Sequence, residues 1–65
     1  MSTSVASELS VTAEHVERYR ERVAALAQPL LDGHHEDAVA TMFEAERALR
    51  TAHRLLDRAS AMLRA

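Results

Sequence analysis

The sequence of 65 residues contains no cysteine, no tryptophan and no lysine, and it has one glycine and one proline. Without cysteine, disulfides and thiolate metal sites are excluded, and the redox compartment is left open. A chain of this size buries only about 60% of the surface that its unfolded form exposes, so it usually needs disulfides, a metal or a partner. A metal or a partner remains as the source of added stability.

Long apolar runs are also missing. The longest stretch without a polar residue is Val23–Ala27, whereas a membrane span needs roughly 20 apolar residues. The serine-rich start lacks the basic head and the apolar run of a signal peptide. We therefore expect a soluble, cytoplasmic protein with no membrane partner. Of the 48% hydrophobic residues, 13 side chains are alanine, so the core should be thin.

The first part of the chain divides into a tail and a helix. Residues 1–10 contain four serines and one threonine among few apolar groups, which predicts a disordered tail. From Thr12 onward, apolar residues follow the spacing of a helix over about 12–31, capped by Thr12 and broken near Pro29. The apolar positions of this helix are Val16, Tyr19, Val23, Leu26 and Leu30.

A turn and a longer helix follow. Asp32 and Gly33 predict a turn at 32–34, because Gly33 is suited to the left-handed conformation that ends a helix. The second helix should run over about 35–64, with acidic residues in its first turn. Because the turn is short, residues 11–65 are predicted to be an all-α, antiparallel two-helix hairpin with a short first helix and a long second one.

The second helix has a seven-residue repeat of apolar positions. One row holds large side chains, a second row holds only alanine, and a third row widens the apolar stripe. Such a pattern is typical of closely packed antiparallel helices, in which alanine permits close approach and leucine fills the remaining volume. The rows are Met42, Leu49, Leu56 and Leu63; Ala38, Ala45, Ala52 and Ala59; and Thr41, Ala48, Leu55 and Met62.

This hairpin is predicted not to be alone. Folding about Gly33 places Thr12 near Arg54, so the last eleven residues would project beyond the first helix with their apolar side chains uncovered. A second copy would cover them in a homodimeric four-helix bundle, and a different protein is the alternative. The predicted oligomer interface consists of Val16, Tyr19, Val23, Leu26, Ala45, Leu49, Ala52, Leu55, Leu56, Ala59, Met62 and Leu63.

Two groups of residues have the chemistry of metal ligands. The first is the run 34–37, which we interpret as a polar turn with an acidic first helical turn, since adjacent residues on a turn rarely converge on one metal. The second is His15, His53 and Asp57, with Glu14 or Glu17 as a fourth ligand. An ordinary ion pair between His53 and Asp57 is the favoured reading, so we expect neither a metal nor a cofactor.

Catalysis has little support in the sequence. There is no cysteine and no glycine-rich loop, and serine is confined to the first ten residues and Ser60. No activated nucleophile or phosphate cradle is evident, so we expect no enzyme.

The charges are unevenly distributed. Residues 1–46 carry nine acids and three arginines, whereas residues 47–65 carry five arginines and one acid. An anion-binding face made of Arg47, Arg50, Arg54 and Arg58 would suit nucleic acid. The net charge of −2 and the acidic first helix, with Glu14, Glu17 and Glu21, favour pairing within the bundle instead. The predicted function is a small protein–protein association module, in an accessory or regulatory role, with a nucleic-acid-associated regulator as the alternative.

Overall fold

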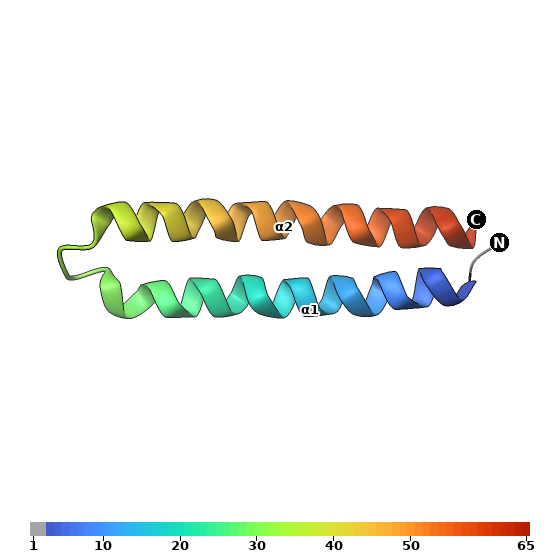
Figure 1. Ribbon diagram of the computed structural model, residues 1–65, viewed down its shortest axis with the longest axis horizontal. Helices are drawn as coiled ribbons and strands as arrows, with labels where there is room; N and C mark the ends of the chain where they lie inside the picture. Colours follow the sequence, from blue (N-terminus) through green and yellow to red (C-terminus); the bar gives the residue numbers. More distant parts are fainter. Residues whose placement is uncertain (1–2) are drawn as a thin grey trace.

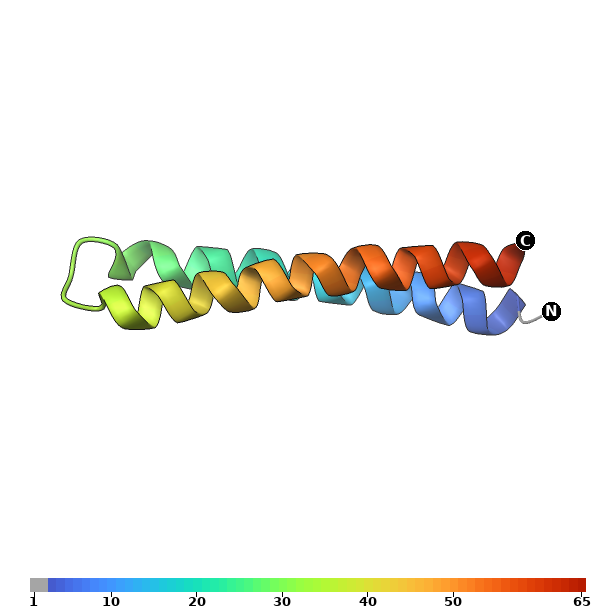
Figure 2. The ribbon, with the colours of Figure 1, turned by 90° about the horizontal axis from the view of Figure 1, so that it is seen from above.

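The computed structural model describes residues 3–65 as two antiparallel helices joined by a short connection (Figure 1). Helix α1 spans Thr3–Ala27, a 3-10 turn η1 spans Gln28–Leu30, and helix α2 spans Glu36–Arg64. The prediction of an all-α helical hairpin is confirmed. The two helices form a single layer, crossing at a shallow angle when viewed from above (Figure 2), and the Cα trace extends over 51 × 13 × 10 Å.

Helix α1 begins nine residues before the predicted start. The serine-rich segment that was predicted to be disordered is helical from Thr3 onward, and Met1 and Ser2 lie outside the described residues. Contact with α2 offsets the entropy of ordering this segment, because Ala6 is fully buried and its carbonyl oxygen accepts a 2.7 Å hydrogen bond from Ser60. Thr12 lies inside the helix rather than at its cap, and its hydroxyl donates to the Glu8 carbonyl at 2.8 Å.

The longer α1 removes the predicted overhang at the end of α2. The two helices lie alongside each other over their whole described length (Figures 1 and 2). Leu56 and Leu63 are accordingly half-buried. Leu55 and Met62 are still 54% and 71% exposed, so the apolar surface that suggested a partner persists on the flank of α2 instead of at its end.

The connection between the helices is held by backbone hydrogen bonds. Helix α1 ends at Ala27, and Pro29 lies in η1, at a position where its missing N–H costs no helical hydrogen bond. The Gly33 N–H donates to the Leu30 carbonyl at 3.2 Å. No glycine among residues 3–65 has a positive φ, so the expectation of a left-handed Gly33 is wrong. Glu36 and Asp37 begin α2, where negative charge stabilises the amino end of the helix.

The row of α2 that faces α1 is polar, not alanine. Hydrogen bonds and ion pairs across the hairpin come from Glu46, His53 and Ser60, each of which follows an alanine of the predicted row by one residue. Ala38 and Ala45 are exposed, and Ala52 and Ala59 are half-buried. We use the term hairpin seam for the two facing rows of residues, and the rows of large apolar side chains lie beside it. The facing rows are Ala6, Ala13, Arg20 and Ala27 on α1, and Val39, Glu46, His53 and Ser60 on α2.

The hairpin has almost no apolar core of its own. Its buried hydrophobic residues are Ala6, Ala13 and Ala27, and within the described range the largest fully buried side chain is Ser60, at 1% exposure. The larger apolar side chains of residues 4–65 all remain partly in water. In the part of the chain that is described, neither helix is long and apolar enough to cross a membrane.

Candidate functional site

A cluster of charged side chains interrupts the middle of the hairpin seam. Arg20 of α1 pairs with Glu17 one turn earlier and with Glu46 of α2, with N···O distances of 2.5 Å. Glu46 also accepts a 3.0 Å hydrogen bond from Arg50. We call Glu17, Arg20, Glu46, Arg50 and His53 the polar cluster. Its arginines and carboxylates satisfy one another, so the charges are tolerated between the helices.

The pairing shifts the titration of the cluster. The hydrogen bond from Arg20 lowers the pKa of Glu17, and its hydrogen bond to Glu46 lowers the pKa of that carboxyl as well. The same two bonds raise the pKa of Arg20. All three side chains are therefore charged at neutral pH, and the cluster acts as an electrostatic link between α1 and α2.

A second polar contact joins the helices near their free ends. The Ser60 hydroxyl donates to the Ala6 carbonyl, so Ser10 is the donor in the 2.9 Å bond between the two serine oxygens. Arg64 donates to Ser60 at 2.6 Å and to Ser10 at 3.3 Å. These contacts fix the register of α1 against α2 at the level of Ala6 and Ser60, where the facing side chains are small.

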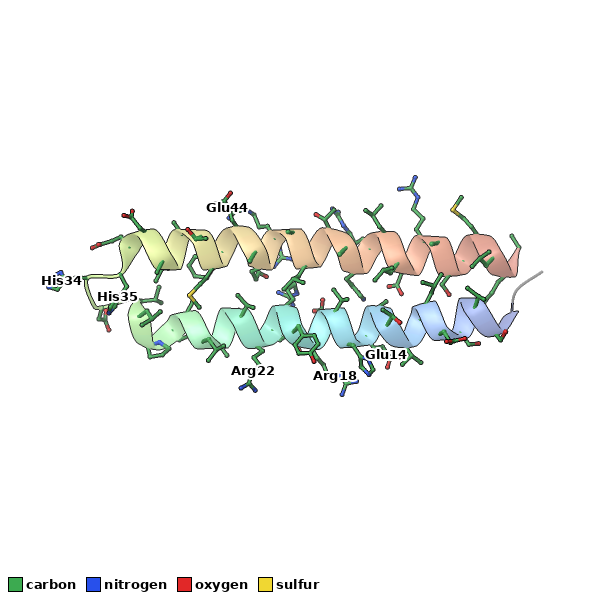
Figure 3. The ribbon with its side chains drawn as sticks, in the orientation of Figure 1. Glu14, Arg18, Arg22, His34, His35 and Glu44 are labelled. Carbon is green, nitrogen blue, oxygen red and sulfur yellow. The ribbon has the colours of Figure 1, made fainter. Side chains whose placement is uncertain are left out.

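The predicted metal ligands are only partly brought together. His53 contacts Asp57 at 3.3 Å and Glu17 at 3.7 Å. His15 lies elsewhere, exposed beside Arg18 and Tyr19 on the outer surface of α1. Within residues 3–65 no group of three or more side chains is arranged to hold a metal ion. His34 and His35 lie at the turn (Figure 3).

The apolar flank of α1 is uncovered. Val5, Tyr19 and Leu26 recur at seven-residue spacing with Thr12 between them, and each immediately precedes a residue of the hairpin seam. Tyr19 is 64% exposed and Leu26 is 52% exposed. The flank therefore continues the apolar surface of the seam outward, beyond what α2 can cover.

The apolar flank of α2 is broader. The predicted alanine row and the row containing Leu55 and Met62 lie next to each other on the helix, and both extend the seam to the same side. Together with the flank of α1 they form a surface that we call the open face. Its members are Val5, Thr12, Tyr19 and Leu26 on α1, and Ala38, Thr41, Ala45, Ala48, Ala52, Leu55, Ala59 and Met62 on α2.

Both flanks lie on one side of the hairpin. Ser10 follows Leu9 in α1, Arg64 follows Leu63 in α2, and these two side chains are hydrogen bonded. Residues that directly follow the row of Leu9 on α1 and the row of Leu63 on α2 therefore lie on the same side of the hairpin. That side also carries Glu17, Arg50 and Asp57. In an antiparallel pair the opposite flanks must then share the other side. The hairpin thus has one polar broad side and one apolar broad side, the open face.

The predicted interface residues fall on or next to the open face. Tyr19, Leu26, Ala45, Leu55 and Met62 are exposed there. The remaining seven are half-buried, Ala52 and Ala59 on the open face and the other five between the open face and the hairpin seam: Val16, Val23, Leu49, Leu56 and Leu63. The sequence prediction did not identify Arg20, Glu46 and Ser60 as contacts between the helices. The signal was present, because Arg20 interrupts a seven-residue repeat of Ala6, Ala13 and Ala27.

The predicted arginine face lies on the outer side of α2. Arg47, Arg54 and Arg58 are exposed, and no ion pair involves them in the described part of the chain. Arg50 is held by Glu46 in the polar cluster. The anion-binding candidates are thus three free arginines and one that is already paired.

Comparison with models of known families, with curated proteins and with solved structures gave no match.

Proposed function

We propose that this protein is a non-enzymatic association module that forms a homodimeric four-helix bundle through its open face. The observation that carries the proposal is the absence of any large, fully buried apolar side chain in residues 4–65 alongside an apolar face on one side only. A second hairpin laid on that face would turn the half-buried leucines into a bundle core. The role proposed for such a module is accessory or regulatory.

The exposed area supports this assembly. A compact monomer of 7.2 kDa has about 4,100 Å² of accessible surface. The hairpin exposes 4889 Å². The excess of about 800 Å² matches the area that one partner contributes to a standard protein interface.

The arginine face supports the alternative, a nucleic-acid-associated regulator, less well. Arg47, Arg54 and Arg58 are free to contact phosphates, but Arg50 is occupied by Glu46. The net charge of −2 opposes non-specific attraction to nucleic acid. Association through the open face is therefore the better-supported function.

The test uses two substitutions at equally exposed apolar residues. Leu55→Glu places a charge on the open face, and we expect it to convert the dimer to a monomer and to lower the thermal midpoint. Val11→Glu is the matched control, because Val11 is 50% exposed, close to the 54% of Leu55, but lies on the outer side of α1. Leu56 is unsuitable because it is half-buried beside the hairpin seam, so a charge there would also disturb the packing of α1 on α2.

The measurement is the solution mass by light scattering across a concentration series, with a helicity melt at each concentration. A dimer for the parent chain and Val11→Glu, and a monomer for Leu55→Glu, is the expected result. A parent chain that stays monomeric and fully helical at every concentration would contradict the proposal.

A further inference from the structure

Charged residues border the open face in a regular order. On the outer edge of α1, Glu8, His15 and Arg22 recur every seven residues, running from acid to base along the chain. The outer edge of α2 also runs from acid to base, through Glu44 and Arg58. All five residues are exposed and make no ion pair among the described residues. Arg22 and Glu44 point away from the opposite helix (Figure 3).

The open face is not equally wide on the two helices. On α2 it includes the outer row with Leu55 and Met62, whereas the equivalent row of α1 is the charged row of Glu8, His15 and Arg22. A partner that covers Leu55 and Met62 must itself be apolar at the outer edge of its helix. Helix α2 of a second copy meets that requirement, and helix α1 does not.

On the basis of the proposed function, we infer that the occupant of the open face is a second copy of this chain with α2 lying antiparallel on α2, α1 on α1, and the two turns at opposite ends. The two-fold axis then passes near the middle of both helices, close to His15 and Thr51. The apolar rows of α2 cover each other, with Leu55 and Met62 against the alanine-rich first half of the partner helix.

The charged edges are complementary in this arrangement. An antiparallel α2 pair centred near Thr51 brings Glu44 of one copy beside Arg58 of the other, twice per dimer. An antiparallel α1 pair centred near His15 brings Glu8 beside Arg22 in the same way. With the turns at the same end, Glu44 would instead meet Arg22, and Leu55 would face the charged edge of α1. Burial of Leu55 and Met62 therefore selects the first arrangement.

A distance between the two turns tests the orientation directly. Because the chain has no cysteine, His34→Cys introduces a single attachment site for a nitroxide spin label, at an exposed position on the turn. The molecule is 51 Å long, so turns at opposite ends predict an inter-label distance of about 50 Å. Turns at the same end predict roughly 10–25 Å, since packed helices are about 10 Å apart. The second result would overturn the inference while leaving the dimer intact.

A label at Thr51→Cys serves as the control. It lies near the middle of α2 and gives a short distance in both arrangements, so it verifies that the labelled chain is dimeric. If neither variant gives a dipolar signal and the mass is that of a monomer, the proposed function itself fails, and the orientation fails with it.

Charge exchange provides a second readout. Glu44→Arg should raise the dimer dissociation constant about tenfold, because two attractive contacts become repulsive. The double variant Glu44→Arg/Arg58→Glu should restore it. Restoration by Glu44→Arg/Arg22→Glu instead would indicate turns at the same end. Tight, salt-sensitive binding of duplex DNA by the parent chain, lost in Arg58→Glu without any change in mass, would assign Arg58 to nucleic acid and overturn its role in the dimer.

Discussion

Ser60 occupies a position where the two helices approach closely. It is the most buried side chain of α2, and it faces Ala6, which is fully buried. Its hydroxyl satisfies the Ala6 carbonyl and accepts from Ser10, so a polar side chain is accommodated without an unpaired group. Serine here combines small size with a hydrogen bond across the hairpin.

Two substitutions at Ser60 separate these contributions. Ser60→Ala keeps the small size and should lower the free energy of unfolding by about 1 kcal/mol through the lost hydrogen bond. Ser60→Leu should cost more, about 1–3 kcal/mol, because the helices must move apart. Urea denaturation at fixed protein concentration measures both, with Ala61→Leu at the exposed neighbouring position as the control. Equal losses for Ser60→Leu and Ala61→Leu would show that close approach is unimportant.

The polar cluster is the other feature that depends on single residues. Glu17 and Glu46 both have a pKa lowered from the ordinary 4.5 by hydrogen bonds from Arg20. Folding therefore favours the charged, deprotonated forms of these two carboxyl groups over their protonated forms. The groups that face them are Arg20, Arg50 and His53.

The sign of the pH dependence follows from these lowered values. The stabilisation by Glu17 and Glu46 is complete above about pH 4.5 and is lost as the pH falls through the lowered folded pKa values. We expect the thermal midpoint to fall as the pH is lowered below 4.5. Glu46→Gln should make this decline shallower, whereas Glu14→Gln should not, because Glu14 points away from α2 (Figure 3). An unchanged decline in Glu46→Gln would refute the link.

At the scale of the elements, the two helices and their antiparallel pairing were predictable from the sequence. The seven-residue repeats predicted a helical hairpin, and Pro29 and Gly33 located the turn region. The start of α1 was not predictable from local composition, because the contacts that order this serine-rich segment, from Ala6 and Ser10 to Ser60, are made with the other helix. The sequence predicted that the alanine row of α2 faces α1, but the facing row lies one residue later, at Glu46, His53 and Ser60. The two rows are adjacent in the sequence, and only contacts with α1 distinguish them.

The turn gives a direct test of one difference from the sequence prediction. Gly33 has no positive φ, so alanine fits its backbone conformation. A Cβ atom there would meet Cδ2 of His35 at 3.0 Å, and this exposed ring can turn away. Gly33→Ala should therefore raise the free energy of unfolding by about 0.5 kcal/mol, by restricting the unfolded chain.

Chemical denaturation of Gly33→Ala measures this change. The double variant Gly33→Ala/His35→Ala, compared with His35→Ala alone, removes the ring contact from the comparison. A loss of about 1 kcal/mol in both backgrounds would mean that Gly33 needs the left-handed conformation after all.

At the scale of the whole molecule, one layer of two helices has two unequal broad sides. The polar side carries Glu17, Arg50 and Asp57, and the open face carries Tyr19 and Leu55. The exposed apolar residues of α2 were predictable because the apolar stripe of α2 is wider than one neighbouring helix can cover. The side on which they gather was not, since it depends on which row α1 occupies. The partner and its orientation are proposals that rest on this asymmetry.

The spacing of the contacts along the chain also orders the steps of folding. The Arg20–Glu46 pair closes a loop of 26 residues, and the Ser60–Ala6 bond spans 54. Each doubling of loop length adds about 0.6 kcal/mol to the entropic cost of closure. The contacts between α1 and α2 should thus form first near the turn and then progressively toward the chain ends. The serine contacts form last and open first, so fraying begins where the two termini lie together.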